Sequence, residues 1–412
     1  MSRKKTLREI YGEDFEKELA LYQTLKEWFR ESFGKKPESF YRAPGRVEIG
    51  GNHTDHQGGV TLSAATGLDM IAAVAPRRDN EIYLLSEGYG RLSLTLTDTG
   101  MREEEKGQTA ALLRGMAASF RKNNKLPEEA GGMEIALISR VPAGMGFSSS
   151  ASFELLLGTI FNHQWKAGLE EGELARMAQE TENAYFGKPC GLLDQLSCAL
   201  GGILSVDFSG REPWVRRIKT DLSRSGIRMF MVLSGNSHKD LTEEYAAIPR
   251  ECGQVAAYFG QERLCQVPEA SFWEALPDLR KACGDRAVLR SAHVFEENRR
   301  ALSEAMCLLK GNYDGFLKLV RESGRSSAMY LQNLVPGHSP EQQDMLVTMA
   351  LCEHVLRGRG AVRVHGGGFG GSLQVFVPQE LAQEFENQME AFHRTVLSVS
   401  ISPLGGTGVD YS

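Results

Sequence analysis

Charged and apolar positions interleave over the first forty residues, where the spacing of Leu19, Leu21, Leu25 and Phe29 predicts a helix. Apolar runs at 70–76 and 81–86 predict two strands, which we expect to pair with each other. Further strands are predicted at 133–142, 201–208 and 228–237, and on both sides of a glycine-rich loop within 361–378. Helices are predicted at 151–165, 173–187 and 293–311, and another starts near 190.

These elements define a fold class and a division of the chain. Strands and helices are interspersed without the regular spacing of strand–helix–strand units, so the pattern favours an α+β fold over a doubly wound sheet. A chain of 412 residues is too long for one typical core, which predicts two domains. No repeat or low-complexity linker marks the boundary. We place it between an N-terminal domain, 1–209, and a C-terminal domain, 210–412.

Composition narrows the class of protein. Apolar residues make up 42% and charged residues 24%, which is ordinary for a soluble globular chain. A net charge of −6 argues against a nucleic-acid or membrane partner but leaves room for a local basic pocket. The seven cysteines form no C-x-x-C pair, so neither a zinc knuckle nor a disulfide framework is indicated. We expect a cytoplasmic protein, with a monomer favoured although the sequence leaves the oligomeric state open.

One short segment has the features of an anion site. A predicted strand, two glycines (Gly144 and Gly146), three serines (Ser148, Ser149 and Ser150) and a predicted helix follow one another. Glycines let the backbone approach an anion closely, and the first N–H groups of a helix point at it. A serine as helix cap is the alternative, but one serine would suffice for that. The segment is not a Walker A loop, and three serines favour phosphate binding.

Two carboxylates lie at unusual places in predicted helices. Glu182 falls at the edge of an apolar face, where it could share Mg²⁺ with a serine hydroxyl and nucleotide phosphates. A solvated boundary residue is the alternative, and periodicity alone favours it. Asp194 lies among leucines and could cap a helix, form an ion pair or act as a base near a reacting hydroxyl.

Two further segments are rich in chemistry. Residues 52–56 combine an amide, two imidazoles, a hydroxyl and a carboxylate, which suits a polyhydroxylated ligand. A polar surface loop is the alternative, and a metal site would need a further ligand that is not evident. The glycine-rich loop at 365–371 indicates either a tight turn or a close approach to a ligand.

Taken in order, these segments resemble the motifs of the GHMP kinases, and specifically of the galactokinase family. PGRVEIGGNHTDHQGG resembles the family's P-G-R-V-N-L-I-G-E-H-T-D-Y signature, and GMGFSSSAS its G-L-S-S-S-A-S phosphate loop. KPCGLLDQ is similar to P-C-G-I-M-D-Q, and GGGFGGS to G-G-G-F-G-G-C. SHKDLTEEYAAIPREC, RSAHVFEENRRA and SPLGG also fit, so the resemblance extends over nearly the whole chain.

The resemblance implies ATP-dependent phosphoryl transfer to the anomeric hydroxyl of a sugar, with ATP and Mg²⁺ as cofactors. Asp194 matches the family's catalytic aspartate and Arg46 the arginine paired with it. Ser150 and Glu182 match the magnesium-binding positions. The phosphate-binding positions would be Gly144, Gly146, Ser148, Ser149, Ser150 and Ala151.

The same resemblance assigns the sugar site and the architecture. Its sugar contacts correspond to Asn52, His53, Asp55, Gly191 and Tyr245, and we add Gly367 and Gly368 of the glycine loop. It implies an N-terminal domain like domain 2 of ribosomal protein S5 and a ferredoxin-like C-terminal domain, with roughly the last 25 residues returning to the first domain. The active site would lie between the two.

Departures from the signature concern the substrate. Asn52 replaces the family's glutamate near the sugar C6 hydroxyl, and His56 replaces a tyrosine. Glu48 and Gly50 stand where Asn and Ile are usual. An amide at position 52 would not repel a carboxylate at C6, so galacturonate or another modified hexose or pentose is an alternative to galactose.

Two other classes of protein resemble this one. Some galactokinase relatives are sugar- and nucleotide-sensing regulators without catalysis, but those are expected to lack part of the serine–alanine stretch or the aspartate. Ser150, Ala151, Asp194 and Arg46 are all present here, which favours an enzyme. Kinases of the mevalonate or homoserine type share the phosphate loop but not the G-N-H-T-D segment.

Overall fold

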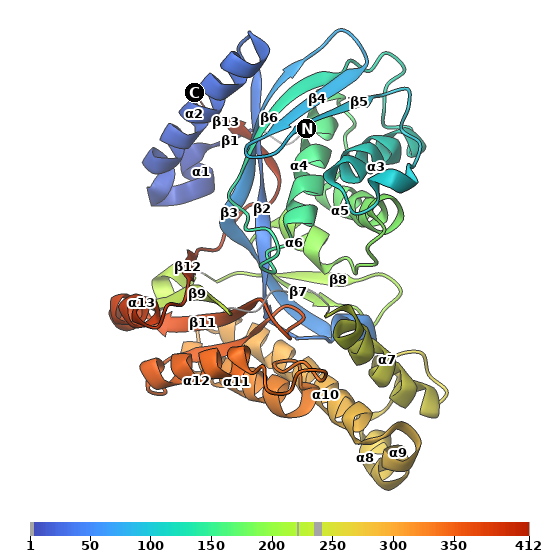
Figure 1. The fold of residues 1–412 in the computed structure, drawn as a ribbon, viewed down its shortest axis with the longest axis vertical. Coiled ribbons are helices and arrows are strands. Elements are labelled where there is room, and N and C mark those ends of the chain that lie inside the picture. Colours follow the sequence, from blue (N-terminus) through green and yellow to red (C-terminus); the bar gives the residue numbers. More distant parts are fainter. Residues whose placement is uncertain (1–3, 221, 235–240, 412) are drawn as a thin grey trace.

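The computed structural model describes residues 4–220, 222–234 and 241–411, and within these ranges it contains a nine-stranded and a four-stranded sheet flanked by helices (Figure 1). The predicted α+β class is therefore confirmed. The end of the predicted strand at 228–237 and the start of the quoted segment at 237–252 lie outside the described residues.

The larger sheet has the order β1-β13-β2-β3-β6-β4-β5, and β7 joins β8 to the open end of β3. Its strands are β1 (Lys5–Thr6), β2 (Ser39–Gly50), β3 (Val60–Pro76), β4 (Glu81–Ser86), β5 (Arg91–Thr95), β6 (Met133–Ser139), β7 (Ile203–Asp207), β8 (Trp214–Ile218) and β13 (Thr407–Asp410). The expected pairing of 70–76 with 81–86 is wrong, because β6 lies between them, antiparallel to β3 and parallel to β4. All but the last residue of β6 are buried, so this strand takes the inner position.

Each face of the larger sheet is covered by helices, as the alternation along β3 requires. Ile71, Ala73 and Ala75 pack with the first helices, whereas Ala72 and Val74 pack with the later ones on the other face. Figure 1 shows α1 and α2 on one side of the sheet and α3 to α6 on the other. These helices are α1 (Leu7–Tyr11), α2 (Phe15–Phe33), α3 (Thr109–Lys122), α4 (Ser149–Gln164), α5 (Glu171–Thr181) and α6 (Leu193–Leu200).

The smaller sheet is fully antiparallel, with the order β10-β11-β9-β12. Its strands are β9 (Ile227–Leu233), β10 (Ala361–His365), β11 (Ser372–Pro378) and β12 (Val396–Val399). The second half of the chain also contains the helices α7 (Thr242–Tyr258), α8 (Glu269–Glu274), α9 (Leu276–Cys283), α10 (Asp285–Leu309), α11 (Tyr313–Ser326), α12 (Asp344–Leu356) and α13 (Ala382–Ala391). The predicted strand–glycine loop–strand unit is confirmed by β10 and β11.

Several elements link the two halves of the chain. β8 follows the predicted division at 209/210 but pairs with β7, and β13 near the C-terminus pairs with β2. Ala305 and Leu308 of α10 belong to the same apolar core as the larger sheet. The division into two domains stays a prediction. Among the described helices, none combines the length and the apolar character that a membrane span requires.

Candidate active site

An arginine, an aspartate and a serine from three different elements meet beside the phosphate-loop candidate. Arg46 of β2 donates through Nε to Oδ1 of Asp194 at 2.7 Å, and its Nη2 lies 2.6 Å from the same oxygen. Ser148 Oγ donates to the other oxygen, Oδ2, and Arg46 also donates through Nη1 to the carbonyl of Gly146. Both carboxylate oxygens therefore have a fixed partner, and the pair is joined to the loop at 144–150.

The electrostatics of this group keep Asp194 ionised. Burial opposes ionisation, but the Arg46 charge and the hydrogen bonds from Ser148 and Arg46 outweigh it and lower the pKa of Asp194. The side chain of Asp194 still has 22% of its surface exposed, compared with 12% for Arg46. The carboxylate is thus held in place and remains accessible to a ligand.

The start of α4 offers backbone donors rather than a capped helix end. Ser148 occupies the N-cap position in the left-handed region (φ 55°, ψ 56°), and its hydroxyl makes no capping hydrogen bond because it donates to Asp194. The N–H groups of Ser149, Ser150 and Ala151 lie in the first helical turn, where the helix supplies no acceptor. The geometry therefore supports the anion-site interpretation over the helix-cap alternative.

Gly144 and Gly146 allow the backbone conformation of the loop at 144–150. Both have positive φ (72° and 81°), and a Cβ at Gly146 would approach His365 Nδ1 to 2.9 Å. On the opposite side, Gly45 lies at an irregularity of β2, and a Cβ there would come within 2.9 Å of the Phe147 carbonyl oxygen. The positive φ of Gly144 and Gly146, the His365 ring beside Gly146 and the Phe147 backbone beside Gly45 therefore favour glycine at these positions.

The two predicted metal-binding residues lie next to each other. Ser150 Oγ donates to Glu182 Oε1 at 2.8 Å, and Lys188 Nζ lies 2.9 Å from the same oxygen. Glu182 is fully buried at the start of a π-helical turn (Glu182–Phe186) that replaces the end of the predicted helix at 173–187. A hydroxyl and a carboxylate oxygen are the hard donors that Mg²⁺ prefers, so the donor set fits this ion.

The sequence analysis missed the support of this carboxylate. Gln195 Nε2 donates to Glu182 Oε2 at 2.7 Å and to Glu154 Oε2 at 3.3 Å. Burial and the charge of Glu182 raise the pKa of Glu154 well above its usual value. Lys188 and Gln195 could have been found from the sequence, because both lie in the KPCGLLDQ segment around Asp194.

The structure places Asn52 inside the protein, at the end of β2. Its amide is 1% exposed, and Nδ2 donates to Glu48 Oε1 at 3.0 Å and to the Gly366 carbonyl at 2.7 Å. Asn333 Nδ2 donates to its Oδ1 at 3.0 Å. These contacts join the segment at 52–56 to the glycine loop, so the amide holds the two loops together. A contact of Asn52 with a sugar stays a prediction.

His53 and Tyr245 also meet the glycine loop. His53 Nε2 lies 3.1 Å from the carbonyl oxygen of Gly367, and the Tyr245 hydroxyl donates to that of Gly368 at 2.9 Å. A Cβ at Gly367 would overlap the Tyr245 ring, and one at Gly368 would overlap the Asn333 carbonyl. The close approach that these two glycines allow is therefore to protein groups, the Tyr245 ring on α7 and the Asn333 backbone.

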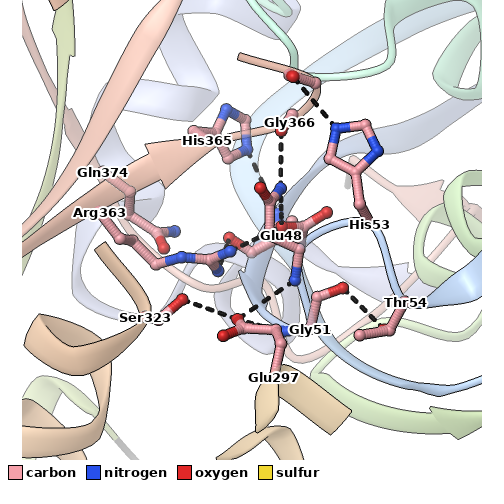
Figure 2. Close-up of polar contacts among 12 residues, drawn as sticks. Glu48, Gly51, His53, Thr54, Glu297, Ser323, Arg363, His365, Gly366 and Gln374 are labelled. Carbon is pink, nitrogen blue, oxygen red and sulfur yellow. Dashed lines mark hydrogen bonds and ion pairs between the residues drawn. The ribbon is translucent and has the colours of Figure 1, made fainter. Parts of the chain in front are cut away.

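A buried carboxylate on α10 supports this loop from below. Glu297 accepts hydrogen bonds from the backbone N–H groups of Gly51 (3.2 Å) and Asn52 (3.3 Å) and from Ser323 Oγ (2.7 Å), and it pairs with Arg300. Figure 2 shows the Glu297 carboxylate between Ser323 and Gly51. Burial opposes ionisation, but the charges of neighbouring cationic groups and the Ser323 hydrogen bond lower the pKa of Glu297 to about 2.

Asp55, in the loop at 52–56, and Gly191 line a cleft of about 390 Å³. A Cβ at Gly191 would lie 3.5 Å from Asp55 Oδ2, so the two face each other closely. Gly191 is three residues before Asp194 in the chain. Both residues belong to the predicted sugar site, so this part of the site borders an open space.

Glu304 of α10 makes the stability of the fold depend on pH. It is fully buried, neither carboxyl oxygen has a hydrogen-bond partner in the described part of the chain, and a Cβ at Gly50 would overlap it. Burial and the charge of Glu297 raise the pKa of Glu304 well above its usual value. A raised pKa means that this group stabilises the fold below its unfolded pKa and that the contribution is lost as pH rises.

We therefore predict that Glu304→Gln gains stability relative to the wild type as pH rises. Above roughly pH 5, the unfolding free energy of Glu304→Gln should rise relative to that of the wild type by up to about 1.4 kcal/mol per pH unit, since the amide does not titrate. Urea unfolding at pH 5, 6, 7 and 8 measures it, with Glu296→Gln on the same helix as the control. A difference that stays constant with pH would contradict the assignment of a neutral Glu304.

Comparisons with known proteins agree with this geometry. The model of the galactokinase galactose-binding signature matches residues 27–76, which include β2 and the loop at 52–56. The model of the GHMP kinases N terminal domain matches residues 111–202, which include the start of α4, Glu182 and Asp194. The two matches thus include Arg46, the start of α4, Glu182 and Asp194, whereas α10 and the glycine loop at 365–371 lie outside both.

Solved structures share the fold. Lactococcus lactis galactokinase complexed with galactose is 22% identical, with a TM-score of 0.79 over 94% of this chain and 99% of its own. The mevalonate kinase of Methanococcus jannaschii is 16% identical, with a TM-score of 0.65 over 88% and 98%. The phosphomevalonate kinase of Streptococcus pneumoniae is 9% identical, with a TM-score of 0.61 over 88% and 99%. The chain therefore has the fold of the GHMP kinases, matches the galactokinase galactose-binding signature over residues 27–76 and matches the N-terminal domain of the GHMP kinases over residues 111–202.

Proposed function

We propose that this protein transfers the γ-phosphoryl group of ATP to the anomeric hydroxyl of galactose or a closely related sugar. The observation that carries the proposal is the Arg46–Asp194–Ser148 group beside the open N-terminus of α4. It puts an ionised acceptor for a hydroxyl proton next to backbone donors for a phosphate. Phosphoryl transfer needs mainly such positioning and charge neutralisation.

The lowered pKa of Asp194 defines its role. A carboxylate stabilised by Arg46 and Ser148 is a weak base towards a resting hydroxyl, so its first task is to accept the hydroxyl hydrogen bond and align the oxygen. It accepts the proton as the bond to phosphorus forms and the hydroxyl becomes acidic. Arg46 remains paired with the carboxylate and faces the loop through the Gly146 carbonyl.

The phosphate chain would lie along the loop from Gly144 to Ala151. The N–H groups of the first turn of α4 would donate to its oxygens, and the helix dipole favours negative charge there. Ser150 and Glu182 would hold Mg²⁺, which when bound neutralises phosphate charge. Lys188 Nζ, 2.9 Å from Glu182 Oε1, pairs with that carboxylate and adds positive charge at the same edge.

Turnover with a panel of sugars tests the proposal. ADP release with Mg-ATP is measured against galactose, galacturonate, N-acetylgalactosamine, arabinose and glucose. Phosphorylation of galactose above all others supports the proposal in its narrow form, and preference for another sugar supports the sugar kinase with a different acceptor. No turnover of any sugar, together with measurable ATP or sugar binding, would refute it and favour a sensing protein.

Glu48 and Asn52 provide a second test, because the galactokinase signature that this chain resembles has Asn and Glu at these positions in the reverse order. In this protein the amide donates to the carboxylate, and Arg363 binds that carboxylate at 2.7 Å. Asn52→Glu alone would set two buried carboxylates against each other, and we expect it to cost about 3 kcal/mol of unfolding free energy.

The double variant Glu48→Asn/Asn52→Glu should recover at least half of that loss, because it restores one carboxylate and one amide. Thermal and urea unfolding of the two single variants and the double variant give the coupling. Additive losses would mean that the two side chains do not depend on each other. The galactose-to-galacturonate ratio of the double variant then reports whether the position of the carboxylate affects substrate choice.

A further inference from the structure

The cleft that Asp55 and Gly191 line is also bordered by charged residues that have no role in the proposed function. The same cleft is also lined by Arg176 of α5 and by Arg211 and Glu212, which lie between β7 and β8. Arg176 pairs with Glu212 at 2.9 Å, and both side chains are more than half exposed. Such a pair contributes little to stability and is easily exchanged for another partner.

Arg211 differs from the other arginines near the site. It is exposed, lines the cleft and makes no ion pair or side-chain hydrogen bond within the ranges that the structure describes. By contrast, Arg46 is fully engaged with Asp194. The cleft therefore offers one unpaired guanidinium and a second one whose present partner is a weakly held carboxylate.

The remaining lining suits a sugar. Phe208, Leu192 and Pro213 give an apolar surface for a ring face, and the Gln179 amide, which donates to the Cys190 carbonyl at 3.1 Å, adds polar groups. Pockets that bind small ligands combine such apolar walls with a few polar groups that fix orientation. The volume of about 390 Å³ is enough for a sugar substituent or a further ring.

We propose that this cleft binds a negatively charged group, a carboxylate or a phosphate, which the acceptor sugar carries away from the hydroxyl that is phosphorylated. Arg176 and Arg211 are its partners, and the Glu212 carboxylate occupies the place of that group when no acceptor is bound. Arginine forks match planar and tetrahedral oxyanions well, which favours such a ligand. The inference rests on the proposed sugar kinase activity and names the class of its acceptor.

Opposite charge changes on the two sides of the ion pair test the proposal. For the wild type, Arg176→Gln, Arg211→Gln and Glu212→Gln, kcat/KM is measured with galacturonate, glucuronate, galactose 6-phosphate and galactose. The ratio of the best anionic sugar to galactose should fall about tenfold in each arginine variant, as expected for one lost charge-assisted hydrogen bond. It should rise in Glu212→Gln, because a competing carboxylate is removed.

Two controls separate charge from structure. Arg216→Gln, on β8 and outside the cleft, should leave the ratio unchanged. Added salt should lower the ratio for the wild type but not for the Arg176→Gln/Arg211→Gln double variant, because exposed charges are screened. A merely structural effect of the substitutions would not reverse sign between Arg176 and Glu212.

The outcomes distinguish this inference from the proposed function. In one outcome, the protein turns over galactose, shows no preference for any anionic sugar and gives the same anionic-sugar-to-galactose ratio in all variants. That result would overturn the anion subsite without contradicting the proposed kinase activity. No turnover of any sugar would refute the kinase, and calorimetric binding of galacturonate then decides the subsite. Binding that weakens in Arg211→Gln supports it, and binding that is equal in both proteins or absent overturns it.

Discussion

Replacing Asp194 with asparagine is expected to lower turnover roughly a thousandfold or more, as for other catalytic groups, while the protein stays folded. Asparagine has the same size but cannot accept the hydroxyl proton, and it no longer neutralises Arg46. The initial rate of ADP release under saturating Mg-ATP and sugar gives the size of the effect. Near-normal turnover would remove Asp194 from the mechanism.

A second arginine–aspartate pair on the same strand provides the control. Arg42 Nε of β2 donates to Asp69 Oδ2 at 2.7 Å, and both side chains are fully buried. Asp69→Asn should destabilise the fold and leave the turnover of the folded protein close to that of the wild type. An equal loss of turnover in both variants would mean that the effect of Asp194→Asn comes from disturbed packing around β2.

Replacing Glu297 with alanine is expected to cost about 3–5 kcal/mol of unfolding free energy, because a buried charge is left without its partner. Arg300 loses its closer ion pair and keeps only the contact with Glu296 at 3.5 Å, and the N–H groups of Gly51 and Asn52 lose their acceptor. Urea unfolding at pH 7 measures the loss. Glu296→Ala is the matched control, since Glu296 is adjacent on α10 and one-third exposed, at 32%.

The same residue gives a test with a defined sign. Because the folded pKa of Glu297 is lowered to about 2, its contribution is complete above the unfolded pKa and is lost as pH falls towards 2. The stability difference between the wild type and Glu297→Gln should therefore shrink on acidification. A difference that stays constant down to the acid transition would argue against an ionised Glu297.

The buried charge of Glu297 holds the loop at 52–56, so we expect Glu297 to affect sugar binding as well as stability. Glu297 reaches the backbone of Gly51 and Asn52, directly before His53 and Asp55, so the loop that we assign to the sugar is anchored from a helix in the second half of the chain. We infer that variants of Glu297 which still fold raise KM for the sugar more than they lower kcat. Glu297 itself lies beneath the loop, so it acts on the sugar site by positioning the loop.

Local pattern was sufficient wherever one segment decides its own structure. The helix at α4, the strand–glycine loop–strand unit of β10 and β11, and the inner strand β6 were all predicted from spacing and apolar content. The pairing of Ser150 with Glu182 and of Arg46 with Asp194 followed from motifs, and both pairs are in contact in the structure. Their catalytic and metal-binding roles remain proposals.

Other features depend on residues far apart in the sequence. The position of β6 between β3 and β4 depends on which strand can be buried on both faces. The motif assigns Asn52 to the sugar, but in the structure its amide forms hydrogen bonds with Glu48, Asn333 and the glycine loop. No local pattern reveals whether a polar side chain points into the protein or out of it.

By itself, the sequence determined the α+β class and the order of the chemistry-bearing segments, because both depend on short-range spacing and composition, and its motifs carried the resemblance to the GHMP kinases. Only the tertiary structure decided what each polar group contacts: that Ser148 donates to Asp194 and leaves the start of α4 open, that Lys188 and Gln195 hold Glu182, and that Arg176 and Arg211 share one cleft with Asp55. The physical reason is that a hydrogen bond or ion pair depends on distances of about 3 Å between atoms, and long-range packing sets those distances.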